Sequence, residues 1–410
     1  MKLPAAGGAR ALPVDRALPG RAPRLLVVSH PAVVDVNQLV YRELSRRGWD
    51  LEIVVPSRWR SEYSGERMRP TVLPGLEDSL RRTPVLLAGR PQRHLYLTRC
   101  RALCARNQPD VAFVEAEPYS LSGFQWSTAL ARTGVPFGVQ CYENIDRPLP
   151  APVRALRSRL LERAAYVAAR SQSAGELALR WGARGQVALA PPAVPGWEPA
   201  GTAARPFTVG YAGRLVASKG LSDLLAAVRL LDGPVHLTLI GDGELRDQLE
   251  GQAIPGSRVR VLSGLSHDEM ARGYAQIDVL ALPSRTTPTW KEQFGRVIVE
   301  ALWCGVPVVG SDSGEIPWLI GLTGGGLVFP EGDSGALAQR LAELRRSPEL
   351  RRTLAEAGRS EVRRRFSVAA ATDALEKLLR AAAGLPIAAE ADSSTAPGTA
   401  ARARRSSAAS

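Results

Sequence analysis

The sequence predicts an α/β protein made of two domains in series. Short apolar runs alternate with helical stretches along most of the chain, which is the pattern of parallel sheets covered by helices. The 410 residues exceed what one hydrophobic core organises, and a Pro/Gly-rich segment at 191–206 divides the alternation into two series. We therefore expect two Rossmann-like domains, with ligand sites at the carboxyl ends of the strands, facing a deep cleft.

The first series contains six apolar runs, and each is predicted to be a buried strand because Val, Leu, Ile and Ala fill it on both faces. They lie at 24–29, 50–55, 110–115, 136–141, 165–170 and 186–190. Between the first two, Leu39, Val40 and Leu44 recur at helical spacing, and Gly48 follows as a stop signal.

The second series has the same alternation. Its predicted strands lie at 207–213, 235–243, 259–264, 278–284, 307–312 and 325–330. Its predicted helices lie at 219–231, 244–252, 266–276, 295–304 and 334–346. Ser266 and Glu269 have the spacing of a capping box at the start of the third helix. Residues 348–384 are rich in Arg, Ala and Leu and are also predicted to be helical.

These patterns divide the chain into six parts. We expect an N-terminal domain over 24–195, a linker over 196–206 and a C-terminal domain over 207–365. A C-terminal helix over 366–384 is expected to pack back toward the N-terminal domain. The low-complexity ends, 1–23 and 385–410, are expected to be disordered.

Composition restricts the class of protein. The chain has 45% hydrophobic residues, no apolar run of 18 residues and no signal-peptide pattern, so we expect a cytoplasmic protein. The four scattered cysteines are expected to be reduced. The net charge of +13 comes largely from the first half, which favours an anionic partner there, including peripheral attachment to the inner face of a membrane. No nucleic-acid-binding motif is present, and no such partner is expected.

The stretch WKEQFGRVIVEAL, residues 290–302, contains two glutamates eight positions apart, Glu292 and Glu300. A helix is predicted from Gly295, so the carboxylates would lie ~12 Å apart along it, too far for one small ion but suited to an extended ligand with separated hydroxyl groups. The N–H groups of Phe294, Gly295 and Arg296 would point outward and attract a phosphate or an electron-rich oxygen. The alternative is a pair of exposed surface glutamates.

The stretch YAGRLVASKG, residues 211–220, follows the first strand of the second domain. Gly213 would let the backbone approach a ligand, and Arg214 and Lys219 are types of side chain that clamp a diphosphate. Asp242 lies in a Gly-Asp-Gly turn after the next strand. The alternatives are solvated surface cations and an ordinary turn residue.

Taken in order, the blocks GRLVASKG, IGDGELRDQLE, SGLSHDEM, KEQFGRVIVEALWCGVPVVGSDSGEIPWLI and GLVFPEGD resemble the retaining family 4 glycosyltransferases of GT-B fold. The resemblance covers about 207–335. It implies that Arg214 and Lys219 contact the donor diphosphate, Glu300 the ribose, and Glu292 the transferred sugar. The amides of 294–296 would meet sugar and phosphate, and Asp242 and Leu265 would line the base pocket. Arg214, Lys219 and Glu292 are then the expected catalytic residues.

The acceptor side is less well marked. Family members often carry a histidine after the fourth strand, where this chain has Glu143 and Asn144 in QCYENIDR. His30 ends the first strand at the edge that faces the cleft, and Glu115 and Glu117 follow another strand. We select His30, Glu143 and Asn144 as acceptor-side candidates; the alternative for the glutamate clusters is a solvated loop.

The predicted function is transfer of a sugar from a nucleotide-diphosphate sugar, a UDP- or GDP-sugar, to a glycan, glycolipid or small-molecule acceptor, as in polysaccharide biosynthesis. The resemblance implies retention at the anomeric carbon, by a front-side route in which the donor phosphate accepts the acceptor's proton. No metal and no cofactor are expected, because no cluster of ligating residues stands out. Three alternatives stay open: a nucleotide-sugar epimerase or hydrolase of this fold, a catalytically silent nucleotide-sugar binder, and a basic scaffold.

Overall fold

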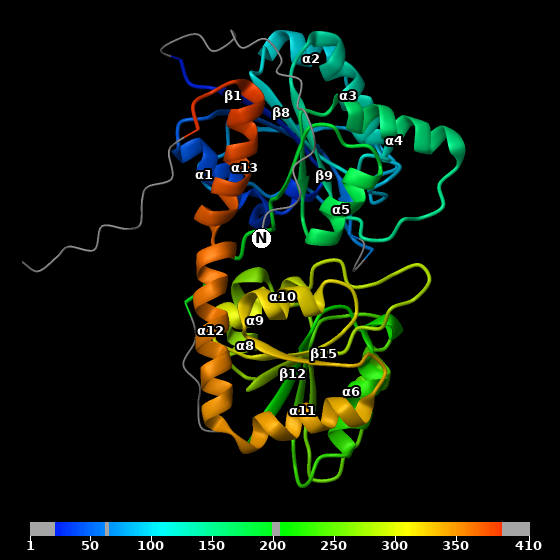
Figure 1. Ribbon diagram of the computed structural model, residues 1–410, viewed down its shortest axis with the longest axis vertical. Coiled ribbons are helices and arrows are strands. Elements are labelled where there is room, and N and C mark those ends of the chain that lie inside the picture. Colours follow the sequence, from blue (N-terminus) through cyan, green and yellow to red (C-terminus); the bar gives the residue numbers. More distant parts are fainter. Residues whose placement is uncertain (1–20, 62–64, 199–205, 388–410) are drawn as a thin grey trace, which may run out of the picture.

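The computed structural model describes residues 21–61, 65–198 and 206–387, which form two α/β domains, one above the other in Figure 1. Most of the segments expected to be disordered or to act as the linker, residues 1–20, 199–205 and 388–410, lie outside the described residues.

A seven-stranded parallel sheet forms the N-terminal domain. Its strand order is β11 (Gln186–Leu189), β10 (Tyr166–Ala169), β9 (Phe137–Cys141), β8 (Val111–Glu115), β1 (Arg24–Ser29), β2 (Asp50–Pro56) and β5 (Leu80–Thr83). The six predicted strands are confirmed. Sequence reasoning missed β5, because this edge strand reads LRRT and carries two exposed arginines in place of an apolar run.

Helices cover both faces of this sheet. They are α1 (Leu39–Arg46), α2 (Cys100–Asn107), α3 (Leu121–Thr133), α4 (Ala151–Arg163) and α5 (Gln172–Arg180). Two short antiparallel pairs are added near the carboxyl ends of the strands, β3 (Trp59–Arg60) with β4 (Arg67–Met68) and β6 (Val85–Leu86) with β7 (Leu95–Tyr96). Cys100, Cys104 and Cys141 are free and buried, as expected for reduced core thiols.

The C-terminal domain contains a six-stranded parallel sheet, and all six strands were predicted. Its order is β14 (Val259–Leu262), β13 (His236–Ile240), β12 (Thr208–Ala212), β15 (Val279–Leu282), β16 (Val308–Ser311) and β17 (Gly326–Phe329). The chain order reverses between β12 and β15, as it does between β1 and β8 in the first sheet. Ligands bind at such reversal points in parallel α/β sheets.

The helices of this domain are α6 (Leu221–Arg229), α7 (Arg246–Glu250), α8 (Met270–Tyr274), α9 (Arg296–Trp303), α10 (Ile316–Thr323) and α11 (Ser334–Arg346). The Ser266–Glu269 capping box is confirmed, but it starts a 3₁₀ turn that precedes α8. Helix α10 was not predicted. It is short, apolar on most sides and has a proline as its second residue, so it lacks the helical period that marks α9.

The chain crosses between the domains twice, and the two crossings lie side by side. Helix α12 (Pro348–Phe366) packs on α9 and α10, whereas α13 (Val368–Ala383) packs on α1 in the other domain (Figure 1). Glu376 of α13 forms an ion pair with Arg47 at 2.9 Å. The N–H of Val194, just before the linker, donates to the carbonyl of Phe366 at 2.8 Å. This paired crossing is where a hinge motion of the two domains would be centred.

Candidate functional site

A cleft of about 850 Å³ lies between the two domains. Its lining includes eight of the residues predicted for the site: His30, Glu143, Gly213, Arg214, Asp242, Leu265, Arg296 and Glu300. The other five, Lys219, Glu292, Phe294, Gly295 and Asn144, are held immediately behind this lining by the contacts described below. The structure therefore gathers the motifs of the second half around one wall of the cleft.

Lys219 and Glu292 form a close ion pair. The Lys219 Nζ lies 2.7 Å from Glu292 Oε2, and the Ser284 hydroxyl donates to the same oxygen at 2.8 Å. Glu292 is only 8% exposed, so the alternative of a surface glutamate is wrong for this residue. Lys219 is set in place by Gly220, whose φ of +67° and closeness to the Pro283 carbonyl leave no room for a side chain.

Glu300 is buried on the inner face of α9. The Tyr274 hydroxyl donates to its Oε2 at 2.8 Å, and Arg296 forms an ion pair with its Oε1 at 2.9 Å. Burial raises the pKa of Glu300 above its ordinary value, while Arg296 and Tyr274 oppose this shift. At 4% exposure it is not a surface glutamate either, yet it still lines the cleft.

The amino end of α9 points its backbone toward the cleft wall. Gly295 has a φ of +75°, and in the described chain the N–H groups of Phe294, Gly295 and Arg296 have no hydrogen-bond acceptor. The Phe294 side chain turns the other way, into the core against Phe366 at 5.9 Å between ring centroids. These amides are therefore available to a ligand, and the Arg296 side chain also lines the cleft. That the amides meet the sugar and phosphate stays a prediction.

The Glu292 loop is fixed by contacts from both domains. The backbone carbonyl of Glu292 accepts from Asn144 Nδ2 at 2.8 Å and from the Glu315 N–H at 3.1 Å. Asn144 belongs to the N-terminal domain and is 5% exposed, so the predicted acceptor-side residue is a link between the domains. The solvated-loop alternative is wrong for Asn144 and for Glu143, which is 4% exposed.

Two glycine-containing loops are joined at the base of the cleft. The N–H of Gly213 donates to the Ile240 carbonyl at 2.9 Å, and the N–H of Leu215 to the Asp242 carbonyl at 2.8 Å. The side chain of Asp242 also accepts from the N–H of Gly243 at 2.8 Å. This bond is what the alternative interpretation of Asp242, as an ordinary turn residue, predicts. Both loops line the cleft, with Arg214 exposed at its surface.

A pair of carboxyl groups lies on the opposite wall. Glu143 accepts from Arg147 at 2.7 Å and from the Tyr119 hydroxyl at 3.2 Å. One oxygen of Glu117 accepts from the N–H groups of Tyr142 and Glu143, and the other is buried without a partner in the described structure. Burial, and then the charge of Glu143, raises the pKa of Glu117 to about 8, so this carboxyl holds its proton to a higher pH than an ordinary glutamate does. The sequence pointed to Glu117 only as a carboxylate after a strand.

His30 lies in an aromatic cluster on the same wall. Its ring centroid is 5.2 Å from Trp59 and 5.1 Å from His94, and its Nδ1 is buried with no partner among the described residues. Burial, and then His94, lowers the pKa of His30 to about 3, so its ring is neutral. Sequence reasoning selected His30 but missed Trp59, in β3, and His94, in the connection between β6 and β7.

We expect His30 to make the protein sensitive to acid. The unfolded ring takes up a proton near pH 6.5, whereas the folded ring resists protonation until about pH 3. Folding stability is therefore full above pH 6.5 and should fall below it, by up to about 1.4 kcal/mol per pH unit for one histidine. His30→Phe should lose stability less steeply between pH 6.5 and 4.5 in urea unfolding curves. Equal slopes for both proteins would contradict the assignment. His94, whose pKa burial also lowers, and carboxyl groups such as Glu361, whose pKa is lowered by hydrogen bonds from Arg364 and Arg365, contribute to the slope that remains.

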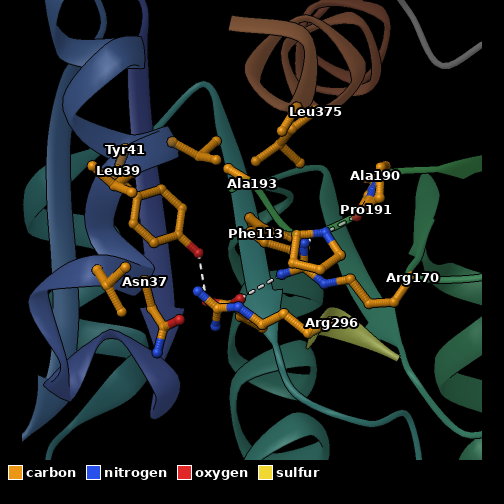
Figure 2. Close-up of a pocket in the computed structure, with 15 residues that line it drawn as sticks. Asn37, Leu39, Tyr41, Phe113, Arg170, Ala190, Pro191, Ala193, Arg296 and Leu375 are labelled. Atoms are coloured by element: carbon orange, nitrogen blue, oxygen red, sulfur yellow. Dashed lines mark hydrogen bonds and ion pairs between the residues drawn. The ribbon is translucent and has the colours of Figure 1, made fainter. Parts of the chain in front are cut away.

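A smaller cavity of about 50 Å³ lies behind the cleft, where the two domains meet (Figure 2). Glu115 accepts there from the Tyr41 hydroxyl at 2.5 Å and pairs with Arg170 at 2.6 Å. Arg170 also donates to the Ala190 carbonyl at 2.9 Å, which ties this network to the segment that leaves the domain. Figure 2 shows Arg296 reaching in from the other domain beside Arg170.

In the three ranges that the structure covers, no three His, Cys, Asp or Glu side chains are grouped so that they could hold a metal ion. None of the helices in those ranges combines the length and the hydropathy needed to cross a bilayer.

Two parallel α/β domains facing across a cleft define the GT-B fold, and the comparisons with known proteins agree. Residues 198–361 match the family described as glycosyl transferases group 1, and residues 32–193 match the glycosyl transferase 4-like domain. Together the two matches cover most of the chain, which belongs to this glycosyltransferase family.

Relatives and solved structures extend this result. An uncharacterised glycosyltransferase of Methanocaldococcus jannaschii is 31% identical over 159 residues, which are 38% of this chain and 43% of the relative. A GDP-mannose-dependent mannosyltransferase of Corynebacterium glutamicum, acting on a phosphatidylinositol monomannoside, is 32% identical over 38% of this chain and 42% of its own. The matched segments thus span less than half of these relatives. The Anabaena protein HepE, solved with UDP and glucose, has the same fold, with a TM-score of 0.65 at 19% identity over 87% of this chain and 99% of HepE.

Proposed function

We propose that this protein transfers a sugar from a nucleotide-diphosphate sugar to an acceptor hydroxyl, with retention at the anomeric carbon. The observation that carries the proposal is the composition of one cleft wall. It combines the exposed cation Arg214, the acceptor-free N–H groups at the start of α9 and the buried carboxylate of Glu300. Cations and amides suit a diphosphate, and a buried carboxylate suits a pair of ribose hydroxyls.

The relatives support a nucleotide-sugar donor but leave its base open. One is named for its dependence on GDP-mannose, and one solved neighbour holds UDP-glucose. We propose a UDP- or GDP-sugar as donor, a carbohydrate or lipid-linked sugar as acceptor, and no bound metal or cofactor. The cytoplasmic location and the place in polysaccharide biosynthesis stay predictions.

The ion pairs of the site suggest how the donor is received. Lys219 and Arg296 already lie beside Glu292 and Glu300. In the donor complex, we expect Lys219 to turn toward a phosphate oxygen while Glu292 accepts from a sugar hydroxyl, so that each partner keeps a charge-assisted hydrogen bond. The groups are held in place before the donor arrives, which lowers the cost of ordering them.

The transfer step places negative charge on the leaving diphosphate. The bond between the anomeric carbon and the β-phosphate oxygen breaks with its electron pair on that oxygen, and the acceptor oxygen bonds to the same face of the carbon. The acceptor proton passes to the departing phosphate oxygen. Arg214, Lys219 and the amides of 294–296 stabilise the developing charge. Closure of the domains about the paired crossing excludes water and so limits hydrolysis.

The first test is thermal stabilisation by a panel of UDP-, GDP- and ADP-sugars, run on the wild type and on Glu300→Gln. A ligand at 100 times its dissociation constant adds about 2.7 kcal/mol to native stability, which gives a clear rise in Tm. We expect the shift with one nucleotide class, and its loss in Glu300→Gln. Glu349→Gln, at an exposed position on α12, is the matched control and should keep the shift.

The same samples separate the alternatives. A folded wild type that no nucleotide sugar stabilises would contradict the donor site. A shift together with free sugar or an epimerised donor, and no product with any acceptor, would indicate the hydrolase or epimerase. A shift with no turnover at all would indicate the silent binder.

A further inference from the structure

Most of the large apolar side chains exposed on this protein gather in one part of the N-terminal domain. The described residues include seven such side chains, and Leu230 and Ile387 lie elsewhere. We call the other five the leucine patch: Leu86, Leu87, Leu97, Leu121 and Phe124, which are 37–54% exposed. They belong to the β6–β7 hairpin and the first turn of α3.

The hairpin presents its leucines on one face. Val85 pairs with Tyr96 and Leu86 with Leu95, and the N–H of Leu97 donates to the Pro84 carbonyl at 2.8 Å. Because side chains alternate along a strand, Leu86, Leu95 and Leu97 share the face opposite Tyr96. Tyr96 is 2% exposed, so that face is the one turned into the domain, and the leucine face is turned outward.

Leu87 stands at the end of β6 in an unusual backbone conformation. Its φ is +55°, a region that bulky L-residues avoid. Its side chain is 50% exposed, so no packing of the domain accounts for a leucine at this position. A strained, exposed apolar residue at a loop tip is better explained by a partner outside the chain.

The start of α3 continues the same surface. The N–H of Leu121 donates to the Gln92 carbonyl at 3.0 Å. The Gln125 side chain accepts from the N–H of Tyr96 and donates to its carbonyl, at 3.0 and 2.8 Å. These bonds hold the start of α3 beside the hairpin, and Leu121 and Phe124 are exposed there.

Exposed arginines, which we call the arginine belt, accompany the leucines of the hairpin along the chain. Between Asp78 and Asp110 the chain has no Asp or Glu. The same stretch holds seven arginines, all exposed: Arg81, Arg82, Arg90, Arg93, Arg99, Arg101 and Arg106. Within the described chain only Arg81, through Glu52, has a carboxylate partner. The other six exposed cations belong to the same segment as the apolar hairpin, and this combination suits a surface that is negative outside and apolar beneath.

The patch lies at the mouth of the cleft. Pro91 and Gln92, which connect the two strands of the hairpin, line the cleft. His94, in the same connection, is buried against His30. A surface bound to the leucine patch would therefore lie beside the acceptor wall of the site.

We propose that the leucine patch and the arginine belt dock this domain onto an anionic phospholipid bilayer, and that the acceptor is a sugar carried by a lipid in that bilayer. The leucines would enter the boundary of the acyl chains while the arginines contact headgroup phosphates. The acceptor part of this inference rests on the proposed function; the docking part does not.

The test is sedimentation of the full chain with vesicles of phosphatidylcholine, alone or with 30% phosphatidylglycerol. Each arginine near an anionic surface contributes about fivefold in partitioning, so Arg90→Gln/Arg93→Gln/Arg99→Gln should bind about 100-fold more weakly. Leu86→Ser/Leu97→Ser should weaken binding at least tenfold and leave it more sensitive to salt. The matched control Leu230→Ser/Arg258→Gln, exposed positions in the other domain, should bind as the wild type does.

Donor-induced stabilisation is measured on the same variants, because the donor wall lies in the other domain. A variant that keeps donor-induced stabilisation but loses vesicle binding supports docking. A variant that loses both is misfolded. In that case the test is repeated with Leu97→Ser alone, provided that this variant keeps donor-induced stabilisation. The proposal is overturned if the wild type fails to bind anionic vesicles, if the control binds as weakly as the patch variants, or if Leu86→Ser/Leu97→Ser binds like the wild type. The last result would indicate that the arginines bind a soluble polyanion. A dimer in solution that depends on the leucine patch would indicate that a second copy of the chain covers the patch.

Discussion

Replacing Lys219 with alanine is expected to lower kcat/KM for sugar transfer by about 10²–10³-fold, because one preorganised cation at the leaving diphosphate is removed. The variant also leaves Glu292 buried beside Ser284 without its ion-pair partner. That carboxylate would repel the diphosphate, so a large part of the loss should appear in donor affinity. Release of the free nucleotide diphosphate, with and without acceptor, measures the effect.

Two variants make this result specific. Lys377→Ala removes an exposed lysine of α13 and should leave turnover unchanged. Lys219→Ala/Glu292→Gln should regain donor affinity relative to Lys219→Ala, because the uncompensated carboxylate is gone, but not the full rate. If Lys219→Ala turned over like the wild type, Lys219 would serve only to hold Glu292 in place.

Replacing Arg170 with alanine is expected to destabilise the N-terminal domain by about 3–5 kcal/mol. Arg170 neutralises Glu115, which is 5% exposed, and also bonds to Gln140 at 2.7 Å and to the Ala190 carbonyl at 2.9 Å. Its loss leaves a buried charge and two acceptors unpaired. The midpoint of the N-terminal domain's transition in urea should fall accordingly.

A second substitution at the partner tests the cause. Arg170→Met/Glu115→Leu removes both charges, and it should be more stable than Arg170→Ala even though it changes more atoms. Arg159→Ala, at an exposed arginine of α4, should stay within about 0.5 kcal/mol of the wild type. A loss below 1 kcal/mol in Arg170→Ala would show that water reaches Glu115 and replaces the arginine.

Elements with a strong local pattern were predicted well. Buried strands such as β1 and β12 consist of continuous apolar residues, and the capping box at Ser266 is a local hydrogen-bond pattern. The donor motifs are also local, because Arg214, Lys219 and Glu292 follow strands of one sheet and Glu300 lies in the helix that comes next. Parallel strands bring such residues to one edge whatever lies between them.

Other features depend on neighbours far away in the chain. Edge strand β5 is held by its pairing with β2 and carries little apolar sequence of its own. The alternative of a solvated loop failed for Asn144 because the facing domain covers it, and for Glu143 because Tyr119 and Arg147 of its own domain bind it. The cluster of His30, Trp59 and His94 joins three separate segments of the chain, and no spacing in the sequence predicts that contact.

The sequence by itself determined the class of protein: two parallel α/β domains and a donor motif set, because periodicity and strand-end residues are local properties. Only the tertiary structure decided the state of the site. It paired Lys219 with Glu292 and Arg296 with Glu300, and it left one oxygen of Glu117 and one nitrogen of His30 buried without partners among the described residues. It also placed the connection of the β6–β7 hairpin, through Pro91 and Gln92, in the lining of the cleft. Burial and charge pairing depend on which distant segments meet, and that is set by packing.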